Sequence, residues 1–300
     1  MGSYFSVTVN HHSDSVVKMA VDSCLKFAHN LESQISSWQK NSDTYKVNQN
    51  SGIKAVKVNP TLFNLVKRSK LISEITGGYF DISFASIDKF WDVNKSYSQV
   101  PDSSQIKESV QLIDYTQIEL DEVNYTIFLK KKGMKIGFGA IGKGFLADEC
   151  IKLLKSLGVE SAVINAGGDL KVIGKKNDGK KWSVGIIDPD NKSEYISYLE
   201  IENQGIVTSG NYERFIQIKD KKYCHIIDPK TGWPVEGVKS VTVIAASSEL
   251  ADALATTVFV LGPTEGIALI EQIPNVECVI IDNNKKIFQS KNIELKPKNS

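Results

Sequence analysis

Residues 134–158 read MKIGFGAIGKGFLADECIKLLKSLG, and this stretch decides the class of fold. Its pattern predicts a strand over 134–138, a glycine-rich turn, and a helix that ends before Gly158. Apolar residues recur on one face of that helix, at Leu146, Cys150, Leu153, Leu154 and Leu157. The turn contains G-x-G-x-x-G, whose glycines let backbone N–H groups approach a pyrophosphate at the positive end of a helix.

The sequence beyond this turn argues against a nicotinamide-binding Rossmann fold. Such a fold repeats βαβ units and places an acidic residue about 20 residues after the glycines. Here the next strand, over 162–165, runs into Gly167-Gly168-Asp169, and Asp169 comes later than that spacing requires. Two interpretations of the turn remain. The glycines allow tight packing of a strand on a helix, or they allow contact with an anionic cofactor, with Lys143 supplying positive charge. We favour contact with an anionic cofactor.

The rest of the chain predicts more strands than helices, in irregular alternation. Strands are expected near 5–9, 116–120, 125–130, 170–173, 181–187, 196–201, 213–218, 238–245, 276–281 and 286–289. Further helices are expected over 14–37, 60–76, 248–261 and 264–272, and a loop over 38–52. The first of these helices has its apolar residues three or four apart, at Val17, Val21, Leu25, Ala28, Leu31 and Ile35. In the second, Asn59 is the expected N-cap and Pro60 the first helical residue. This arrangement indicates an α+β fold of mixed sheets with packed helices rather than a doubly wound sheet.

Length and composition are those of an ordinary folded protein. The 300 residues are enough for one large α+β unit or two average domains. Charge is balanced, with 36 Lys and Arg against 35 Asp and Glu, so a basic surface for nucleic acid would have to be local. No basic stripe stands out in the sequence, and we expect no nucleic-acid partner.

The cysteines and the apolar runs exclude several other classes. Cys24, Cys150, Cys224 and Cys278 show no C-x-x-C spacing and no Cys/His cluster, which argues against a zinc site and a disulfide framework. They are typical of small buried apolar residues. No apolar run approaches the ~18 residues of a membrane span, and the N-terminus lacks the layout of a signal peptide. We therefore expect either a cytosolic protein or an exported one whose export segment was trimmed off.

A carboxylate and a hydroxyl project together from the apolar helix over 248–261. Asp252 and Thr256 are four residues apart, so they lie on one face of that helix. A buried carboxylate without a partner is costly, so Asp252 needs one. That partner is a backbone N–H or a lysine, or else a hard cation such as Mg²⁺, which takes oxygen ligands. The helix alone does not choose between them.

A third candidate is the stretch HIIDPKTG at 225–232, an apolar strand that runs into a turn. His225 is placed in that strand, three residues before Asp228, and would be a plausible general base near neutral pH. A strand that ends in an Asp-Pro turn needs no catalytic explanation, because IIDP also occurs at 186–189. His225 is what distinguishes the two stretches.

Taken in order, these segments resemble the ApbE family of FAD:protein FMN transferases over nearly the whole chain. The matching segments are MGS (1–3), SSWQKNSD (36–43), GYFDIS (78–83), GAIGKG (139–144) with Asp148, NAGGD (165–169), TSGNYE (208–213), HIIDPKTG (225–232) and ADALAT (251–256). Each is a weak signal alone, but eight in register are specific. The resemblance implies an ApbE-like, T-fold-like architecture over residues 1–300, either as one body or as two closely packed lobes with the FAD site between them.

The resemblance also implies an activity and a set of site residues. FAD is split at its pyrophosphate, FMN passes to a Ser or Thr hydroxyl of a partner protein, AMP leaves, and Mg²⁺ is required. The family's metal positions correspond to Ala140, Asp252, Ala255 and Thr256. Its flavin contacts correspond to Met1, Trp38, Tyr79, Phe80, Asp81, Lys143 and Ile226. His225 and Asp228 match residues near the reacting phosphate, where His225 would take the proton of the acceptor hydroxyl.

Two positions depart from the family pattern, and two other activities stay open. Gly137 stands where many members have Asp, and Ala85 stands where Pro is common. The same residues would serve a Mg²⁺-dependent FAD pyrophosphatase that gives FMN and AMP, or a non-catalytic protein that binds and carries FAD. Many members of the family are exported lipoproteins, which would place the chain in the cell envelope, although cytosolic members exist.

Overall fold

The structure is a computed structural model that describes residues 4–93, 95, 97–212 and 214–296. The chain divides into two compact units. The first is formed by Met1–Asn30, Ile141–Gly210 and Val238–Ser300, and the second by Leu31–Ala140 and Asn211–Gly237.

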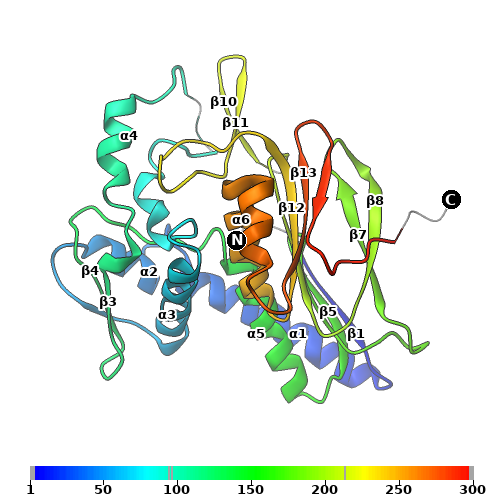
Figure 1. Cartoon of the computed structure of the whole chain (residues 1–300). Helices are drawn as coiled ribbons and strands as arrows, with labels where there is room; N and C mark the ends of the chain where they lie inside the picture. Colours follow the sequence, from blue (N-terminus) through cyan, green and yellow to red (C-terminus); the bar gives the residue numbers. More distant parts are fainter. Residues whose placement is uncertain (1–3, 94, 96, 213, 297–300) are drawn as a thin grey trace. The chain divides into compact units, whose positions relative to one another are not determined.

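The first unit is built on a seven-stranded sheet (Figure 1). The order across the sheet is β1 (Phe5–Asn10), β5 (Ser161–Ala166), β6 (Asp169–Ile173), β9 (Gly205–Gly210), β12 (Val238–Ala245), β13 (Glu277–Asp282) and β14 (Ile287–Gln289). Every neighbouring pair in this sheet is antiparallel. A doubly wound sheet needs parallel strands, so the Rossmann alternative is excluded and the α+β class is confirmed.

The sheet of the first unit is covered on both faces. Helices α5 (Gly142–Ser156) and α6 (Ser248–Ile270) pack on one face, α5 against β5 and β6 and α6 against β9 and β12 (Figure 1). On the other face, the hairpin of β7 (Trp182–Asp188) and β8 (Asn191–Ile201) shares an apolar cluster with Val172, Ile206 and Ile244. Side chains alternate between the faces of a strand, so residues next to these three point toward the helices.

The second unit combines short helices with small sheets. Its helices are α2 (Asp43–Gln49), α3 (Pro60–Ile75) and α4 (Ser103–Val110), with 3₁₀ turns η1 (Ile82–Ile87) and η2 (Tyr115–Gln117). Its strands are β2 (Val56–Lys57), β4 (Thr126–Leu129) and β3 (Ile118–Asp121) in one sheet, and β10 (Phe215–Ile218) with β11 (Lys221–Cys224) in a hairpin. A cluster that includes Ile87, Trp91, Ile106 and Ile216 forms part of its core.

Helix α1 (Asp14–Ile35) confirms the first predicted helix and part of its buried face, since Leu31 and Ile35 are buried. Leu25, which was expected in the apolar stripe, is 48% exposed, whereas Ala20 and Cys24 are fully buried. The Cys24 thiol lies 3.9 Å from the carbonyl oxygen of Cys150 on α5, so small residues let the two helices approach. The predicted start of α3 is confirmed as well, since Asn59 accepts a hydrogen bond from the N–H of Leu62 and Pro60 is the first residue.

The prediction of a loop over 38–52 is wrong for part of that range, because α2 lies within it. Ser42 caps the helix by accepting a hydrogen bond from the N–H of Tyr45, and Asp43 lies in the first turn. Val47 and Asn48 are buried. Serine followed by an acidic residue is typical of the N-terminus of a helix. This helix has only two turns, and because most of its residues are polar it lacks the apolar periodicity by which a helix is predicted.

The predicted strand over 134–138 is also wrong, because this segment has no regular structure. Side chains and a loop carbonyl replace the strand partner. The Asn48 side chain donates to the carbonyl of Ile136 at 2.9 Å and accepts from its N–H at 2.8 Å. Ser86 accepts from the N–H of Lys135 at 3.0 Å, and the N–H of Gly137 donates to the carbonyl of Ile82 at 2.9 Å.

Two further segments differ from what their local sequence suggests. Residues 208–210 have the small polar side chains of a turn, but they are the end of β9, a central strand between β6 and β12. Pairing with both neighbours overrides the local turn chemistry there. The strand that was expected to include His225 ends at Cys224.

Helix α6 is long and apolar enough to cross a membrane by length and composition alone, the one such helix among the described residues. A buried core helix passes the same test, and 44% of its most apolar window is buried inside the structure. Gly262 breaks the helix with φ 76° and ψ −178°, and Pro263 follows it. The stretch before the kink is shorter than the ~20 residues that a spanning helix needs, which favours the expectation of no membrane span.

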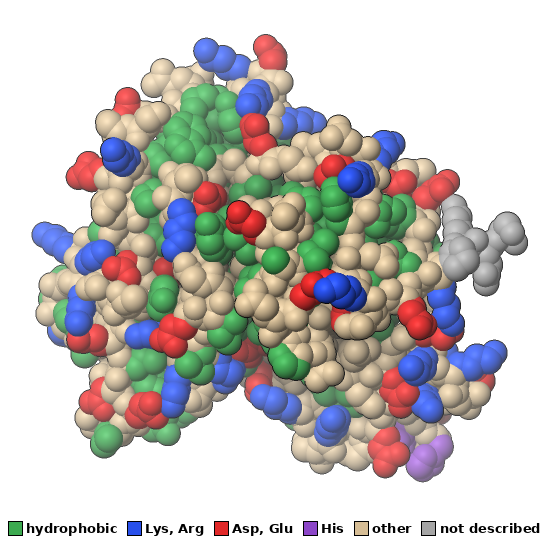
Figure 2. All heavy atoms as spheres, viewed as in Figure 1, with side chains coloured by type: hydrophobic (Ala, Val, Ile, Leu, Met, Phe, Trp, Pro, Cys, Tyr) green, Lys and Arg blue, Asp and Glu red, His purple; other side chains and the backbone are tan. Residues whose placement is uncertain are grey.

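Charged side chains of both signs are interspersed over the face shown in Figure 2. This distribution agrees with the balanced composition. The absence of a nucleic-acid partner stays a prediction.

We predict that Asn48→Ala lowers the free energy of unfolding by about 2 kcal/mol or more, because it leaves two buried backbone groups without partners. Urea denaturation measures this. Asn50→Ala is the matched control: the Asn50 amide also donates to a carbonyl, that of Lys46, but in an exposed position. Its loss should stay within about 0.5 kcal/mol. Equal losses in the two variants would mean that Asn48 does not hold the 134–138 segment.

Candidate active site

The first turns of α5 and α6 approach each other closely at Gly144. A methyl group on Gly144 would lie 2.6 Å from the carbonyl carbon of Ser248 and 2.8 Å from the Cβ of Asp252. Ser248 is fully buried and also lies against Gly205 of β9, where a methyl group would be 2.7 Å from the Ser248 Cα. Only glycine leaves room for α6 at these two places.

This close approach brings Asp252 to the start of α5. The N–H of Gly144 donates a hydrogen bond to Asp252 Oδ2 at 3.0 Å, and Asp252 is only 2% exposed. Burial raises the pKa of the Asp252 carboxyl, while the charge of Lys143, the Gly144 N–H and a hydrogen bond with the Asp169 carboxyl act in the opposite direction. Of the partners left open by the sequence, the structure places a backbone N–H and a lysine at Asp252, and it adds Asp169, which was not expected there.

Thr256 lies one turn after Asp252 on α6 and is half-buried. Its hydroxyl is 3.5 Å from the hydroxyl of Ser209 on β9. Since β9 and α6 are packed together, two hydroxyl oxygens and the Asp252 carboxylate come from adjoining elements of the same unit. Ala255, which precedes Thr256 in the sequence, is fully buried. Ala140 lies in the turn that precedes α5.

Lys143 and Asp169 form a buried ion pair in the same unit. The Lys143 ammonium lies 2.9 Å from Asp169 Oδ2, and their side chains are 24% and 0% exposed. Asp169 opens β6 after a two-residue turn in which Gly167 and Gly168 have φ of 64° and 93°. Positive φ at both central positions suits a tight hairpin, so the two glycines place Asp169 at the head of the strand.

Comparison with known proteins identifies the family. The sequence pattern described as the ApbE family matches residues 1–280. The chain belongs to the ApbE family. It is 32% identical over 292 residues to the FAD:protein FMN transferase of Treponema pallidum, covering 92% of this chain and 81% of that protein. It is 31% identical over 251 residues to the FAD:protein FMN transferase of Klebsiella pneumoniae, covering 83% and 78%.

Solved ApbE structures share the fold. The ApbE protein from Thermotoga maritima superposes with a TM-score of 0.89 at 28% identity, covering 97% of this chain and 94% of that one. The flavin transferase ApbE from Vibrio cholerae superposes with a TM-score of 0.85 at 24% identity, over 97% and 94%. The ApbE-like α+β architecture expected from the sequence is thereby confirmed.

The residues predicted from the ApbE pattern to contact flavin lie in different environments. Trp38 is 64% exposed, and the ring of Tyr79 lies 5.5 Å from the Lys230 ammonium. The side chains of Phe80 and Ile226 are 2% and 6% exposed, so any contact of theirs with a ligand would involve mainly the backbone. Met1 lies outside the described residues.

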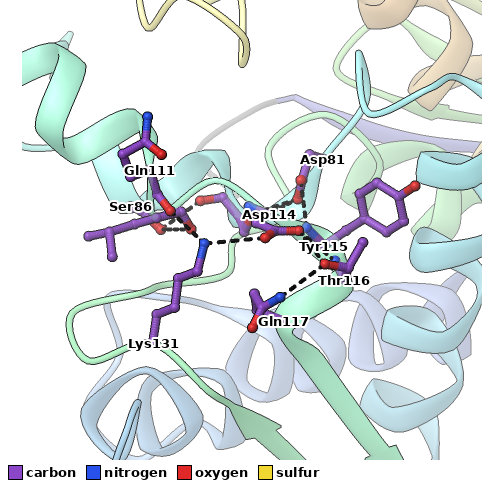
Figure 3. Close-up of polar contacts among 10 residues, drawn as sticks. Asp81, Ser86, Gln111, Asp114, Tyr115, Thr116, Gln117 and Lys131 are labelled. Carbon is purple, nitrogen blue, oxygen red and sulfur yellow. Dashed lines mark hydrogen bonds and ion pairs between the residues drawn. The ribbon is translucent and has the colours of Figure 1, made fainter.

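Asp81, another ApbE motif residue, holds together its own part of the second unit (Figure 3). Its Oδ1 accepts hydrogen bonds from the N–H and the hydroxyl of Ser83 at 2.8 and 2.6 Å, and its Oδ2 accepts from the N–H of Tyr115 at 2.8 Å. Burial raises the pKa of this carboxyl, and these hydrogen bonds oppose the shift. Asp81 therefore ties η1 to the start of η2, and its role toward flavin stays a prediction.

His225 and Asp228 both lie in the loop after β11. His225 Nδ1 is 3.0 Å from the carbonyl oxygen of Arg214. A carbonyl only accepts, so in the neutral ring Nδ1 carries the proton and Nε2 carries the basic lone pair. Asp228 Oδ1 accepts from the N–H of Lys230 at 2.8 Å and its Oδ2 from the Thr231 hydroxyl at 3.0 Å, so this carboxylate closes the turn.

The two departures from the ApbE pattern are neighbours in space. A methyl group on Gly137 would lie 3.0 Å from the Cβ of Ala85, and both residues are buried. A larger side chain at position 137 would have to displace residue 85. The two substitutions are therefore sterically linked.

Sequence reasoning did not identify the partners of Asp169 and Ser209, although both residues lie in motifs of the family pattern. Asp169 holds Lys143, and the Ser209 hydroxyl lies beside that of Thr256. A signal for Asp169 was present, because an acidic residue directly before a buried apolar strand needs a partner. Ser209 gave no comparable signal, since its neighbour is distant in sequence.

We predict that Gly144→Ala lowers the free energy of unfolding by at least about 2 kcal/mol, because the added methyl group collides with the backbone of α6. Thermal and urea unfolding measure this loss. Gly139→Ala is the control, since a methyl group there would meet only the ring of Phe84 at an ordinary 3.6 Å. If Gly144→Ala is as stable as Gly139→Ala, α5 and α6 are not in the contact described here.

Proposed function

We propose that this chain transfers FMN from FAD to a Ser or Thr hydroxyl of an acceptor protein, releases AMP, and uses Mg²⁺ in doing so. Support comes from the family, whose curated members named above are FAD:protein FMN transferases. The observation that carries the proposal is a buried carboxylate and a hydroxyl, Asp252 and Thr256, one helical turn apart beside the Lys143–Asp169 pair.

The donor set of α6 suits magnesium. Mg²⁺ in proteins takes oxygen ligands and uses one or two carboxylates, with water and substrate phosphates completing its shell. Asp252 and Thr256 offer a carboxylate and a hydroxyl, and the family pattern adds the carbonyl of Ala140 and the position of Ala255. Among the described residues, no three His, Cys, Asp or Glu side chains lie together as a metal cluster, so phosphate oxygens would supply the remaining charge. When bound, Mg²⁺ neutralises phosphate charge and polarises the phosphoryl group.

The chain's own groups would bind the diphosphate and move one proton. Lys143, held by Asp169 but still 24% exposed, provides positive charge next to Asp252. The acceptor hydroxyl oxygen forms a bond with the phosphorus of the FMN half, the pyrophosphate P–O bond to AMP breaks, and the hydroxyl proton passes to a base. We assign this base to His225 Nε2, because the carbonyl of Arg214 holds the ring through Nδ1.

The activity is tested by incubating the protein with FAD, Mg²⁺ and an acceptor domain that carries a Ser/Thr flavinylation motif. We expect a covalently flavinylated, fluorescent acceptor and an equal amount of AMP. AMP release at the same rate without acceptor would support the pyrophosphatase. Intact FAD that stays bound under both conditions would support a carrier.

We predict that Asp252→Asn lowers Mg²⁺-dependent turnover at least about 100-fold, because loss of a metal ligand removes several kcal/mol of charge stabilisation. Asparagine has the same shape and can still accept from the Gly144 N–H, so the fold is retained. Initial rates of acceptor flavinylation over a Mg²⁺ titration give the measurement. Asp178→Asn, an exposed residue of the same unit, is the control. Unchanged turnover in Asp252→Asn would remove the metal assignment.

We predict that His225→Ala slows transfer by ~10²–10⁴-fold while FAD still binds, because the general base is lost and the binding groups remain. Flavin fluorescence quenching measures FAD binding, and acceptor fluorescence measures transfer. His29→Ala, on an exposed part of α1, should transfer normally. A normal rate in His225→Ala would show that His225 is structural.

A further inference from the structure

Asp148 of α5 caps the start of α6 from outside that helix. Its Oδ2 accepts a hydrogen bond from the hydroxyl of Ser247 at 2.7 Å and from the N–H of Glu249 at 2.9 Å. Ser247 is the N-cap of α6, and its hydroxyl oxygen accepts from the N–H of Leu250 at 3.2 Å. The first turn of a helix has unpaired N–H groups and a partial positive charge, and a carboxylate satisfies both.

Lys171 of β6 completes this network from the sheet. Its ammonium lies 3.6 Å from Asp148 Oδ1 and donates a hydrogen bond to the carbonyl of Ala246, the residue before the N-cap. The Lys171 and Asp148 side chains are only 10% and 13% exposed. The chain entering α6 is therefore held on two sides, by a carboxylate from α5 and by an ammonium from β6.

A second ion pair joins α5 and β6 with the charges exchanged, so that the lysine is on the helix and the aspartate is on the strand. Lys143 of α5 pairs with Asp169 of β6, and Asp148 of α5 pairs with Lys171 of β6. Residues 143 and 148 are about 7.5 Å apart along a helix axis, and residues 169 and 171 about 6.6 Å apart along a strand. The two axial spacings are similar, and sliding α5 along β6 would bring like charges together. The two ion pairs, of opposite polarity, therefore oppose a shift of α5 along β6.

We propose that Asp148, with Lys171, is a positioning residue for the metal site: it sets α6 so that the Asp252 and Thr256 oxygens are correctly placed for a divalent cation. The hydrogen bond from Glu249 to Asp148 lies one helical turn before Asp252, on the helix whose Asp252 contacts Gly144 of α5. A shift of the first turn therefore moves Asp252. The inference rests on the proposed function, and Asp148 itself touches neither metal nor FAD.

A purely structural role is the alternative, and the two roles respond differently to a second substitution. Removing one member of a buried ion pair leaves an uncompensated charge and is strongly destabilising, whereas removing both often is not. Asp148→Asn leaves Lys171 unpaired. Asp148→Asn with Lys171→Met removes both charges, which should restore stability without restoring the carboxylate at the start of α6.

The experiment titrates Mn²⁺, as a spectroscopic stand-in for Mg²⁺, into the full chain and follows free Mn²⁺ by electron paramagnetic resonance. We expect Asp148→Asn and the double variant each to bind Mn²⁺ at least about tenfold more weakly than the unsubstituted chain, since residues that orient metal ligands typically contribute 10–100-fold in affinity. Urea unfolding should show the single variant destabilised and the double variant largely restored. Glu149→Gln is the matched control: it removes the same charge from the next residue of α5, whose carboxylate forms an ion pair with Lys152 of the same helix.

Each result decides the question. Weak Mn²⁺ binding by a stable double variant supports a positioning role, and normal binding by Glu149→Gln excludes an effect of net charge. If the double variant regains both its stability and its affinity for Mn²⁺, the inference is wrong. It is also wrong if Asp148→Asn binds Mn²⁺ like the unsubstituted chain. Neither result affects the proposed function. Absence of Mn²⁺ binding by the unsubstituted chain overturns the metal assignment of the proposed function as well. If Asp148→Asn does not fold, the double variant still gives the answer.

Discussion

The close contact of α6 with α5 and β9 is the constraint on which the first unit depends. Ser248, fully buried at the start of α6, lies against Gly144 on one side and Gly205 on the other. Neither position has room for a side chain, because the backbone of α6 occupies the space. This contact brings the N–H of Gly144 to the carboxylate of Asp252, so packing and the candidate metal site share the same atoms.

Burying several acidic groups in one unit requires cations at the right places. Asp148, Asp169 and Asp252 all lie near the packed ends of α5, β6 and α6, and their charge is opposed by Lys143 and Lys171. Burial lowers the pKa of the Lys171 ammonium, and Asp148 acts in the opposite direction. Lysines at such a depth persist only with partners. The carboxylates of this region thus have fixed orientations before any divalent cation or phosphate arrives.

Local patterns predicted those elements whose signals are local. The N-cap Asn59 with Pro60 gave the start of α3, and the long apolar run gave α6 with its break at Gly262. The failures have a common cause, since their stabilising partners lie far away in sequence. The 134–138 segment is paired by Asn48 and Ser86, and β9 is a strand because β6 and β12 flank it. Leu25 was assigned to the wrong face of α1 because helical periodicity does not say which neighbour, here Cys150, sits opposite.

In the candidate site, too, contacts within one helix could be predicted from the sequence, whereas contacts between elements could not. Asp252 and Thr256 could be paired from the sequence, because a helix brings residues four apart together. Lys143, Asp169, Asp148 and Lys171 could not be paired, because their contacts depend on the register of α5 over β6. The G-x-G-x-x-G turn illustrates the point. In a parallel βαβ unit its glycines would serve a pyrophosphate, but here the sheet is antiparallel and the next glycine, Gly144, makes room for α6. Tight packing against α6 is therefore the task of Gly144 on the helix, and any phosphate that the turn meets would be bound next to a carboxylate that this packing has put in place.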